Sequence, residues 1–194
     1  GAAIYTAISH DGGRSFEPER RFADHSCECC RIAAALDADG TPLLMWRHVF
    51  APNERDHAIS RVLADGRAES VQQATFDRWQ IDGCPHHGPS LAVDERGVRH
   101  AVWFNQVGEE GRVFSGHPGQ RGSDGANAAG QRTVGSTRAE HADLAIRGAR
   151  VVIAWREFDG ERMRLNAEVS EDYGESFRLV TLASSSGPAD QPRV

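Results

Sequence analysis

The chain has 194 residues, of which 39% are hydrophobic and 26% charged, and its formal net charge is −6 at pH 7. This length and composition predict one globular domain with a hydrophobic core rather than a disordered chain. No apolar run approaches 18 residues, so we expect no membrane-spanning helix. The negative charge argues against a partner bound through a nucleic-acid backbone, although all 22 basic residues are arginine.

The predicted elements are short strands, beginning with one in "AAIYTAIS" at the N-terminus. Three later segments share a pattern of alternating apolar strand, Gly-containing turn and second apolar strand ending in tryptophan. They cover residues 31–49, 89–107 and 142–158. Their tryptophans are Trp46, Trp103 and Trp155, which gives an internal repeat of 50 to 60 residues.

Two more apolar strands follow each tryptophan, and no segment has a convincing helical period. The predicted strands cover 56–64 and 68–75, then 111–117 and 131–136, then 164–170 and 176–183. Four short strands in about fifty residues are typical of one blade of a β-propeller. The sequence therefore predicts an all-β fold of four-stranded antiparallel blades.

Two turns between predicted third and fourth strands have the same sequence pattern, Ser-x-Asp-x-Gly-x-Ser-Phe. They are "SHDGGRSF" (9–16) and "SEDYGESF" (170–177). On these turns the chain resembles the Asp-box (BNR-repeat) family of sialidase-like β-propellers. We expect each aspartate to accept backbone N–H bonds, each glycine to permit an unusual φ, and each phenylalanine to pack on its blade. The structural residues of the two turns are Ser9, Asp11, Gly13 and Phe16, and Ser170, Asp172, Gly174 and Phe177.

The repeat divides the chain into about three and a half blades of a single propeller domain or fragment. We expect a partial blade over 1–26, blades over about 27–83, 84–140 and 141–186, and the start of another at 187–194. Propellers have four to eight blades, so a missing segment or another chain is expected to complete a ring, which we expect to have six or seven blades. Exposed sheet edges would otherwise invite aggregation.

The four cysteines lie where predicted blades begin. Cys27, Cys29 and Cys30 precede the first strand of one blade, and Cys84 precedes that of the next, followed by His86 and His87. Loops entering the first strands emerge on one face of a propeller, so these residues are expected to converge at the mouth of the central channel. His57, His141 and Arg31 are additional candidates on the same face.

Three interpretations of the cysteines remain open: disulfides, redox-active thiols and a metal site. Disulfides suit a periplasmic or extracellular protein, but a bond within Cys-x-Cys-Cys would close only a tiny ring. Thiolates and imidazoles from two loops suit a soft metal ion. The abundance of thiols and the lack of a regular Cys-x-x-Cys pair favour Cu(I), with Zn²⁺ as the alternative.

The resemblance also implies a rival function, exo-α-sialidase activity. Sialidases of this fold bind the substrate carboxylate with an arginine triad and use a tyrosine nucleophile paired with a glutamate. Arg31 and Arg193 precede predicted first strands, as the first triad arginine does, but neither Tyr5 nor Tyr173 has a suitable position. A non-catalytic propeller that binds a protein or glycan is the third possibility. We therefore assign no catalytic residue.

Overall fold

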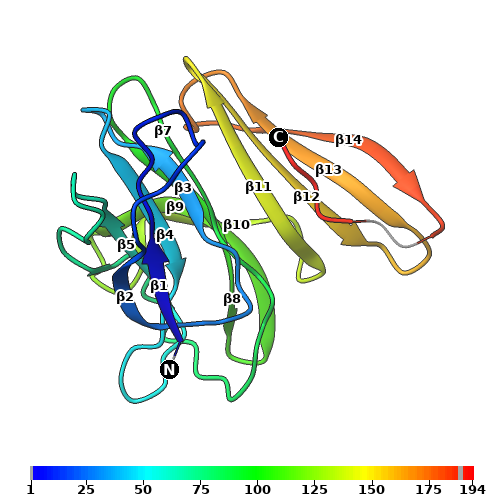
Figure 1. The fold of residues 1–194 in the computed structure, drawn as a ribbon. Helices are drawn as coiled ribbons and strands as arrows, with labels where there is room; N and C mark the ends of the chain where they lie inside the picture. Colours follow the sequence, from blue (N-terminus) through cyan, green and yellow to red (C-terminus); the bar gives the residue numbers. More distant parts are fainter. Residues whose placement is uncertain (1, 188–189) are drawn as a thin grey trace.

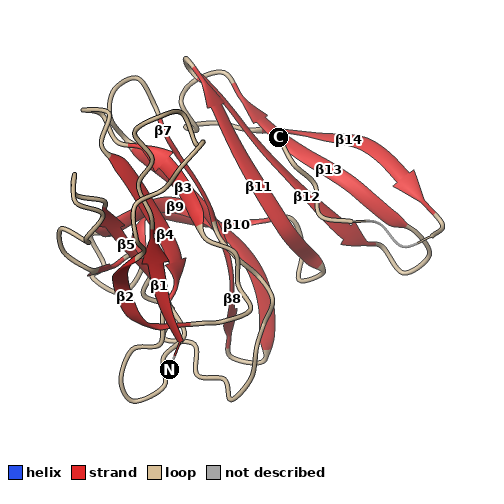
Figure 2. Ribbon diagram, viewed as in Figure 1, coloured by secondary structure: helices blue, strands red, loops and turns tan. Residues whose placement is uncertain are grey.

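The protein is built from strands alone. The computed structural model describes residues 2–187 and 190–194, and no helix occurs among them, so none there could cross a membrane. Their strands form four antiparallel sheets, each of which joins strands in chain order (Figures 1 and 2). The predicted all-β fold is confirmed, and so is the grouping of strands in fours for three of the four sheets.

The strand bounds follow the predicted repeat. The first sheet is a pair, β1 (Ala2–Thr6) and β2 (Arg20–Ser26). The second contains β3 (Ala33–Leu36), β4 (Pro42–Arg47), β5 (His57–Arg61) and β6 (Gln72–Gln73). The third contains β7 (Ser90–Val93), β8 (Arg99–Val107), β9 (Glu110–Arg121) and β10 (Ala128–Val134). The fourth contains β11 (Ala139–Arg147), β12 (Arg150–Phe158), β13 (Met163–Ser170) and β14 (Arg178–Ser185).

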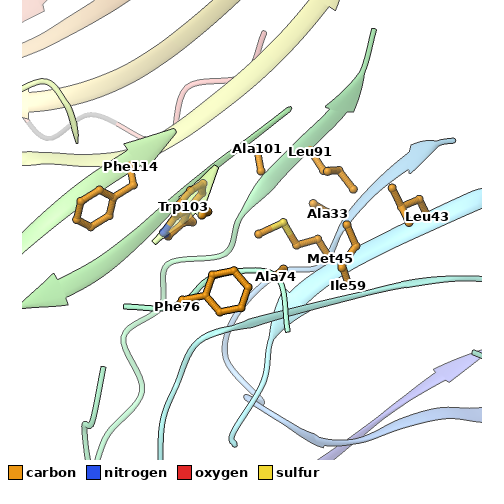
Figure 3. Packing of buried hydrophobic residues seen from close by; sticks show 11 residues of the cluster. Ala33, Leu43, Met45, Ile59, Ala74, Phe76, Leu91, Ala101, Trp103 and Phe114 are labelled. Atoms are coloured by element: carbon orange, nitrogen blue, oxygen red, sulfur yellow. The ribbon is translucent and has the colours of Figure 1, made fainter. Parts of the chain in front are cut away.

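The hydrophobic core is divided into three layers, each lying between consecutive sheets. In the layer between the second and third sheets, Met45 and Ile59 face Leu91 and Trp103 (Figure 3). Equivalent layers join the first sheet to the second and the third to the fourth. The strands inside the stack are therefore buried on both faces, whereas β14 at its end is largely exposed.

The three repeated tryptophans have the same role in their sheets. Each is only 1% exposed and each packs toward the sheet that precedes its own in the chain. Trp46 meets Phe22 of the first sheet edge to face, with ring centroids 5.6 Å apart. The sequence repeat is thus a repeat of packing, since a large ring fills the same inter-sheet gap three times.

One side of β3, in the second sheet, is not covered by a neighbouring sheet. Ala34 pairs with Leu44 as Leu91 pairs with Ala101, so the aligned positions are structurally equivalent. Leu91 is 6% exposed because it faces the second sheet, whereas Leu36, on the same side of β3 as Ala34, is 64% exposed. The pair β1–β2 does not cover this part of β3.

The two Ser-x-Asp-x-Gly-x-Ser-Phe turns have matching hydrogen-bond networks. Asp172 accepts the backbone N–H of Ser176 at 2.9 Å and its hydroxyl at 2.6 Å, while the N–H of Gly174 donates to Ser170 Oγ at 2.8 Å. Asp11 accepts the same two bonds from Ser15, and Gly13 donates to Ser9. Gly13 and Gly174 have φ of 86° and 90°, as expected of these positions.

The two phenylalanines of these turns differ. Phe177 packs against the third core layer and lies under the guanidinium of Arg132, whereas Phe16 is 62% exposed. The expectation that Phe16 packs on its sheet is wrong, because the first sheet has only two strands to receive it.

The C-terminal segment does not begin another strand in its described part. Residues 190–194 have no regular structure, and the rest of the expected segment includes residues 188 and 189, which lie outside the described residues. The N–H of Val194 donates to Asp143 at 3.1 Å, and Arg31 donates to Gln191. This segment therefore lies beside the start of β11 and the loop before β3.

Candidate metal centre

Two loops bring the thiols together at one end of the sheets. The first runs from β2 to β3 and contains Cys27, Cys29 and Cys30, and the second enters β7 and contains Cys84. The N–H of Cys27 donates to the carbonyl of Arg47 at the end of β4, at 2.9 Å, which fixes the first loop to the second sheet. The predicted convergence of the two loops is confirmed, since sulfur atoms from both lie within 4.8 Å of one another.

The sulfur atoms form a compact group. The Sγ atoms of Cys27 and Cys29 are 3.6 Å apart, and Cys30 Sγ is 3.8 Å from both. Cys84 Sγ completes a second trio with Cys27 and Cys29, within 4.8 Å. Zinc–sulfur bonds of about 2.3 Å give a sulfur–sulfur edge of about 3.8 Å in a tetrahedral site. The separations therefore suit thiolates that share a metal ion, and all four cysteines are free.

Gly88 allows the two loops to approach so closely. A Cβ atom at this position would lie 2.3 Å from Arg31 Cγ and 2.6 Å from the Arg31 carbonyl oxygen. Both distances are far inside van der Waals contact. Any side chain at position 88 would therefore push the loop of Cys84 away from the loop of the other three thiols.

Two arginines supply positive charge at the thiols. Arg47 is 1% exposed and donates to the carbonyls of Arg55, at 2.5 Å, and His87, at 3.2 Å, to that of Phe104, and to Asn105 Oδ1 at 2.6 Å. All of these acceptors are neutral.

A buried cation is costly without an anion nearby. Burial lowers the pKa of Arg47, and the charges that oppose this are those of Cys30 and Cys27 and then, more weakly, of Asp56. Arg55 Nη1 lies 3.7 Å from Cys27 Sγ. The two guanidinium groups therefore place positive charge beside the cysteine sulfurs.

The thiols differ in how readily they ionise. Burial raises the pKa of Cys30 to about 12 despite the charge of Arg47. Burial would also raise the pKa of Cys29, but hydrogen bonds from Cys84 and from the His86 backbone N–H lower it overall. By donating to Cys29, Cys84 has its own pKa raised to about 11. Cys29 is thus the sulfur that its neighbours stabilise as a thiolate.

A second group of potential ligands adjoins the thiols. His87, Glu140 and His141 offer ligand atoms that all lie within 4.8 Å of one another. The His87 ring is stacked between Phe104 and His141, with centroids 4.0 Å and 4.4 Å away. Burial and the charges of His141 and of nearby arginines lower the pKa of His87 to about 3, so it is neutral at pH 7. The rings of His87 and His141 lie nearly parallel, with an interplanar angle of 26°.

Some predicted ligands lie outside both groups. His57 is fully buried, with Nδ1 3.2 Å from the Thr75 hydroxyl, and His86 is exposed. Arg31 donates to Gln191 and, at 3.3 Å, to the carbonyl of Ala142, so it joins the loops rather than the sulfurs.

Sequence reasoning missed Arg47, Arg55, Asn105 and Glu140. For Arg47 a signal existed, because Trp46–Arg47 and Trp155–Arg156 repeat a Trp-Arg pair on the equivalent strands β4 and β12. Arg156 Nη2 lies 3.4 Å from Glu140, so this second arginine forms an ion pair with a member of the His87, Glu140 and His141 group.

The tyrosines do not join these groups. The Tyr173 hydroxyl donates to Glu95 at 2.6 Å, but the Tyr173 N–H donates to Ala149, in the turn after β11. Arg31 contacts Ala142, near the start of β11. At about 3.3 Å per residue, the two positions are about 20 Å apart along the strand. Tyr5 is 55% exposed on β1.

Comparison with models of protein families and with curated proteins found no match for the chain.

Proposed function

We propose that this protein binds a soft metal ion, Cu(I), through Cys27, Cys29, Cys30 and Cys84. The observation that carries the proposal is the meeting of free thiols from two loops more than fifty residues apart, since Cys84 Sγ lies within 4.8 Å of both Cys27 Sγ and Cys29 Sγ. Thiolate ligands select Cu(I) and Zn²⁺ over hard cations. The role we assign to the site is metal handling or delivery rather than catalysis.

The choice of Cu(I) rests on which kinds of ligand atom the compact group offers to a metal ion. In the described residues the compact group contains thiols only, while the nearest histidine cluster, around His87, is stacked and separate. Zn²⁺ accepts nitrogen and oxygen ligands readily, whereas low-coordinate Cu(I) is satisfied by sulfur. Zn²⁺ bound by four thiolates is the competing assignment.

The family and the complete architecture are part of the same proposal. The repeated packing of the tryptophans, the contact of β3 with β7 and of β7 with β11, and the matching turns support a sialidase-like β-propeller. The exposed side of β3, with Leu36 and Ile32 at 64% and 44% exposure, supports completion by further blades or another chain. An exported location, periplasmic or extracellular, belongs to this proposal as well.

Beyond the position of Arg31 in the sequence, no observation on the described residues favours sialidase activity. Arg31 is engaged by Gln191 and Ala142, and the Tyr173–Glu95 pair lies at the far end of β11. Glu95 raises the pKa of Tyr173 by accepting its proton in a hydrogen bond, which opposes ionisation of a nucleophile.

Metal analysis of purified protein tests the proposal. Wild-type protein and a Cys29→Ser/Cys84→Ser variant are reduced, loaded anaerobically with Cu(I) or Zn²⁺, desalted and measured by elemental mass spectrometry. His10→Ala is the matched control, because His10 is an exposed potential ligand in the 9–16 turn. We expect copper in wild type and control and at least a tenfold loss in the double variant. Equal, negligible metal in all three would refute the proposal.

A further inference from the structure

The geometry points to a two-ion Cu(I) cluster in which Cys27 and Cys29 bridge both ions and Cys30 and Cys84 each bind one. This inference rests on the proposed function, since it specifies how many ions the thiols bind. It goes further because one mononuclear site would need all four sulfurs around a single centre.

The first argument is the shape of the sulfur group. Cys30 Sγ lies 3.8 Å from both Cys27 and Cys29 and 3.6 Å separates those two, which makes one nearly regular triangle. Cys84 forms a second compact trio with the same two atoms, and Cys30 is not part of it. The sulfurs therefore form two triangles that share the Cys27–Cys29 edge.

The triangle of Cys27, Cys29 and Cys30 matches a three-coordinate ion. Bonds of about 2.3 Å to three sulfurs in a plane give edges of about 4.0 Å, within a few tenths of an ångström of the first triangle. A single tetrahedral ion would require Cys30 and Cys84 to be as close to each other as to the shared pair. Two ions on either side of the shared edge use all four sulfurs without moving the loops together.

The second argument is charge. Four thiolates and two Cu(I) ions carry a net charge of −2, and the adjacent guanidinium groups of Arg47 and Arg55 carry +2. With the two guanidinium groups included, one Cu(I) and four thiolates leave a net charge of −1, whereas two Cu(I) ions and four thiolates leave zero. Zn²⁺ with four thiolates is also balanced, so the shape of the sulfur group decides between them. Arg47 is suited to this task because Asn105 and three carbonyls hold it in place while buried.

The position of Cys29 agrees with a bridging role. Its sulfur is in contact with Cys27 and Cys30 and accepts from Cys84, so it touches thiols of both loops, as Cys27 also does. A bridging thiolate shares its negative charge between two ions, so it must lie beside the other ligands of both ions.

Counting bound ions tests the inference. Apo protein is titrated anaerobically with Cu(I) against a chromogenic Cu(I) chelator, and bound ions are counted by native mass spectrometry. We expect two ions in wild type and His10→Ala, one in Cys30→Ser and one in Cys84→Ser. Loss of the shared sulfur in Cys29→Ser should weaken binding of both ions at least a hundredfold.

The number of bound ions distinguishes failure of the two-ion cluster from failure of the metal-binding function. One ion in wild type would overturn the two-ion cluster and leave the metal-binding function standing. No ion in wild type would overturn both. The wild-type count decides by itself, so the result does not depend on whether every serine variant folds, which circular dichroism would check.

Discussion

Replacing Gly88 with alanine tests whether the two loops must touch for the thiols to act together. The new Cβ would lie 2.3 Å and 2.6 Å from atoms of Arg31, against ordinary contacts of about 3.5 to 4.0 Å. The loops must therefore separate by about 1 Å, which is nearly half of a metal–sulfur bond of about 2.3 Å. The loop of Cys84 then no longer reaches the ions held by the other thiols.

The magnitude follows from overpacking and lost bonds. Forcing one methyl group into a filled contact destabilises the folded state by about 1–3 kcal/mol. For a domain of this size, each kcal/mol lowers Tm by about 2–4 °C. We expect apo Gly88→Ala to unfold at a Tm about 2–12 °C below wild type. With Cys84 displaced, we expect Cu(I) binding to fall to the level of Cys84→Ser.

Gly83→Ala is the matched control for this experiment. It lies in the same loop, and its added Cβ would meet only Ile81, at 3.7 and 3.8 Å, which is ordinary contact. Chelator competition would measure Cu(I) affinity and thermal denaturation would measure Tm for wild type and both variants. Wild-type affinity and stoichiometry in Gly88→Ala would refute the argument that this contact assembles the site.

Three further changes test other parts of the account. Arg55→Gln removes the partly exposed charge 3.7 Å from Cys27 Sγ, and we expect chelator competition to show Cu(I) affinity lower by roughly tenfold with an unchanged Tm; unchanged affinity would show that Arg55 is no counter-charge. Asp172→Asn removes a carboxyl group that accepts hydrogen bonds from Ser170 and Ser176, and these bonds lower its pKa to about 2. The stability that this carboxylate adds is therefore present above about pH 4 and is lost as the pH falls to about 2. We therefore expect the wild-type and Asp172→Asn curves of Tm against pH to converge over that window, and parallel curves would contradict the assignment. A fluorogenic sialoside should not be hydrolysed, and turnover that Arg31→Gln abolishes would restore the sialidase interpretation.

Much of the fold was predictable because its determinants are local and repeated. Period-two alternation, the tryptophan in each second strand, and the Asp-containing turns each recur, and the tryptophans and turn aspartates have the same local role in every copy. Phe16 differed from its copy because its packing depends on strands of the first sheet, and no local pattern reports how many strands a sheet contains.

The site was predictable at the level of loops and not of atoms. The position of Cys27 and Cys84 before equivalent strands was enough to predict that they meet. Which histidines join them depends on side-chain direction, and His87 turns instead to stack on Phe104 and His141. The repeated Trp-Arg pair singles out Arg47 in the sequence, but its role as a counter-charge depends on acceptors from three other segments, which no local pattern reports.

X-ray absorption at the copper edge of Cu(I)-loaded protein tests the central claim most directly, because it reports the atoms bonded to the metal. We predict a first shell of sulfur in wild type, with a copper–copper contribution that disappears in Cys84→Ser, since that variant keeps only the ion bound by Cys27, Cys29 and Cys30. A first shell of nitrogen and oxygen in wild type, or a copper–copper contribution that is unchanged in Cys84→Ser, would contradict the account.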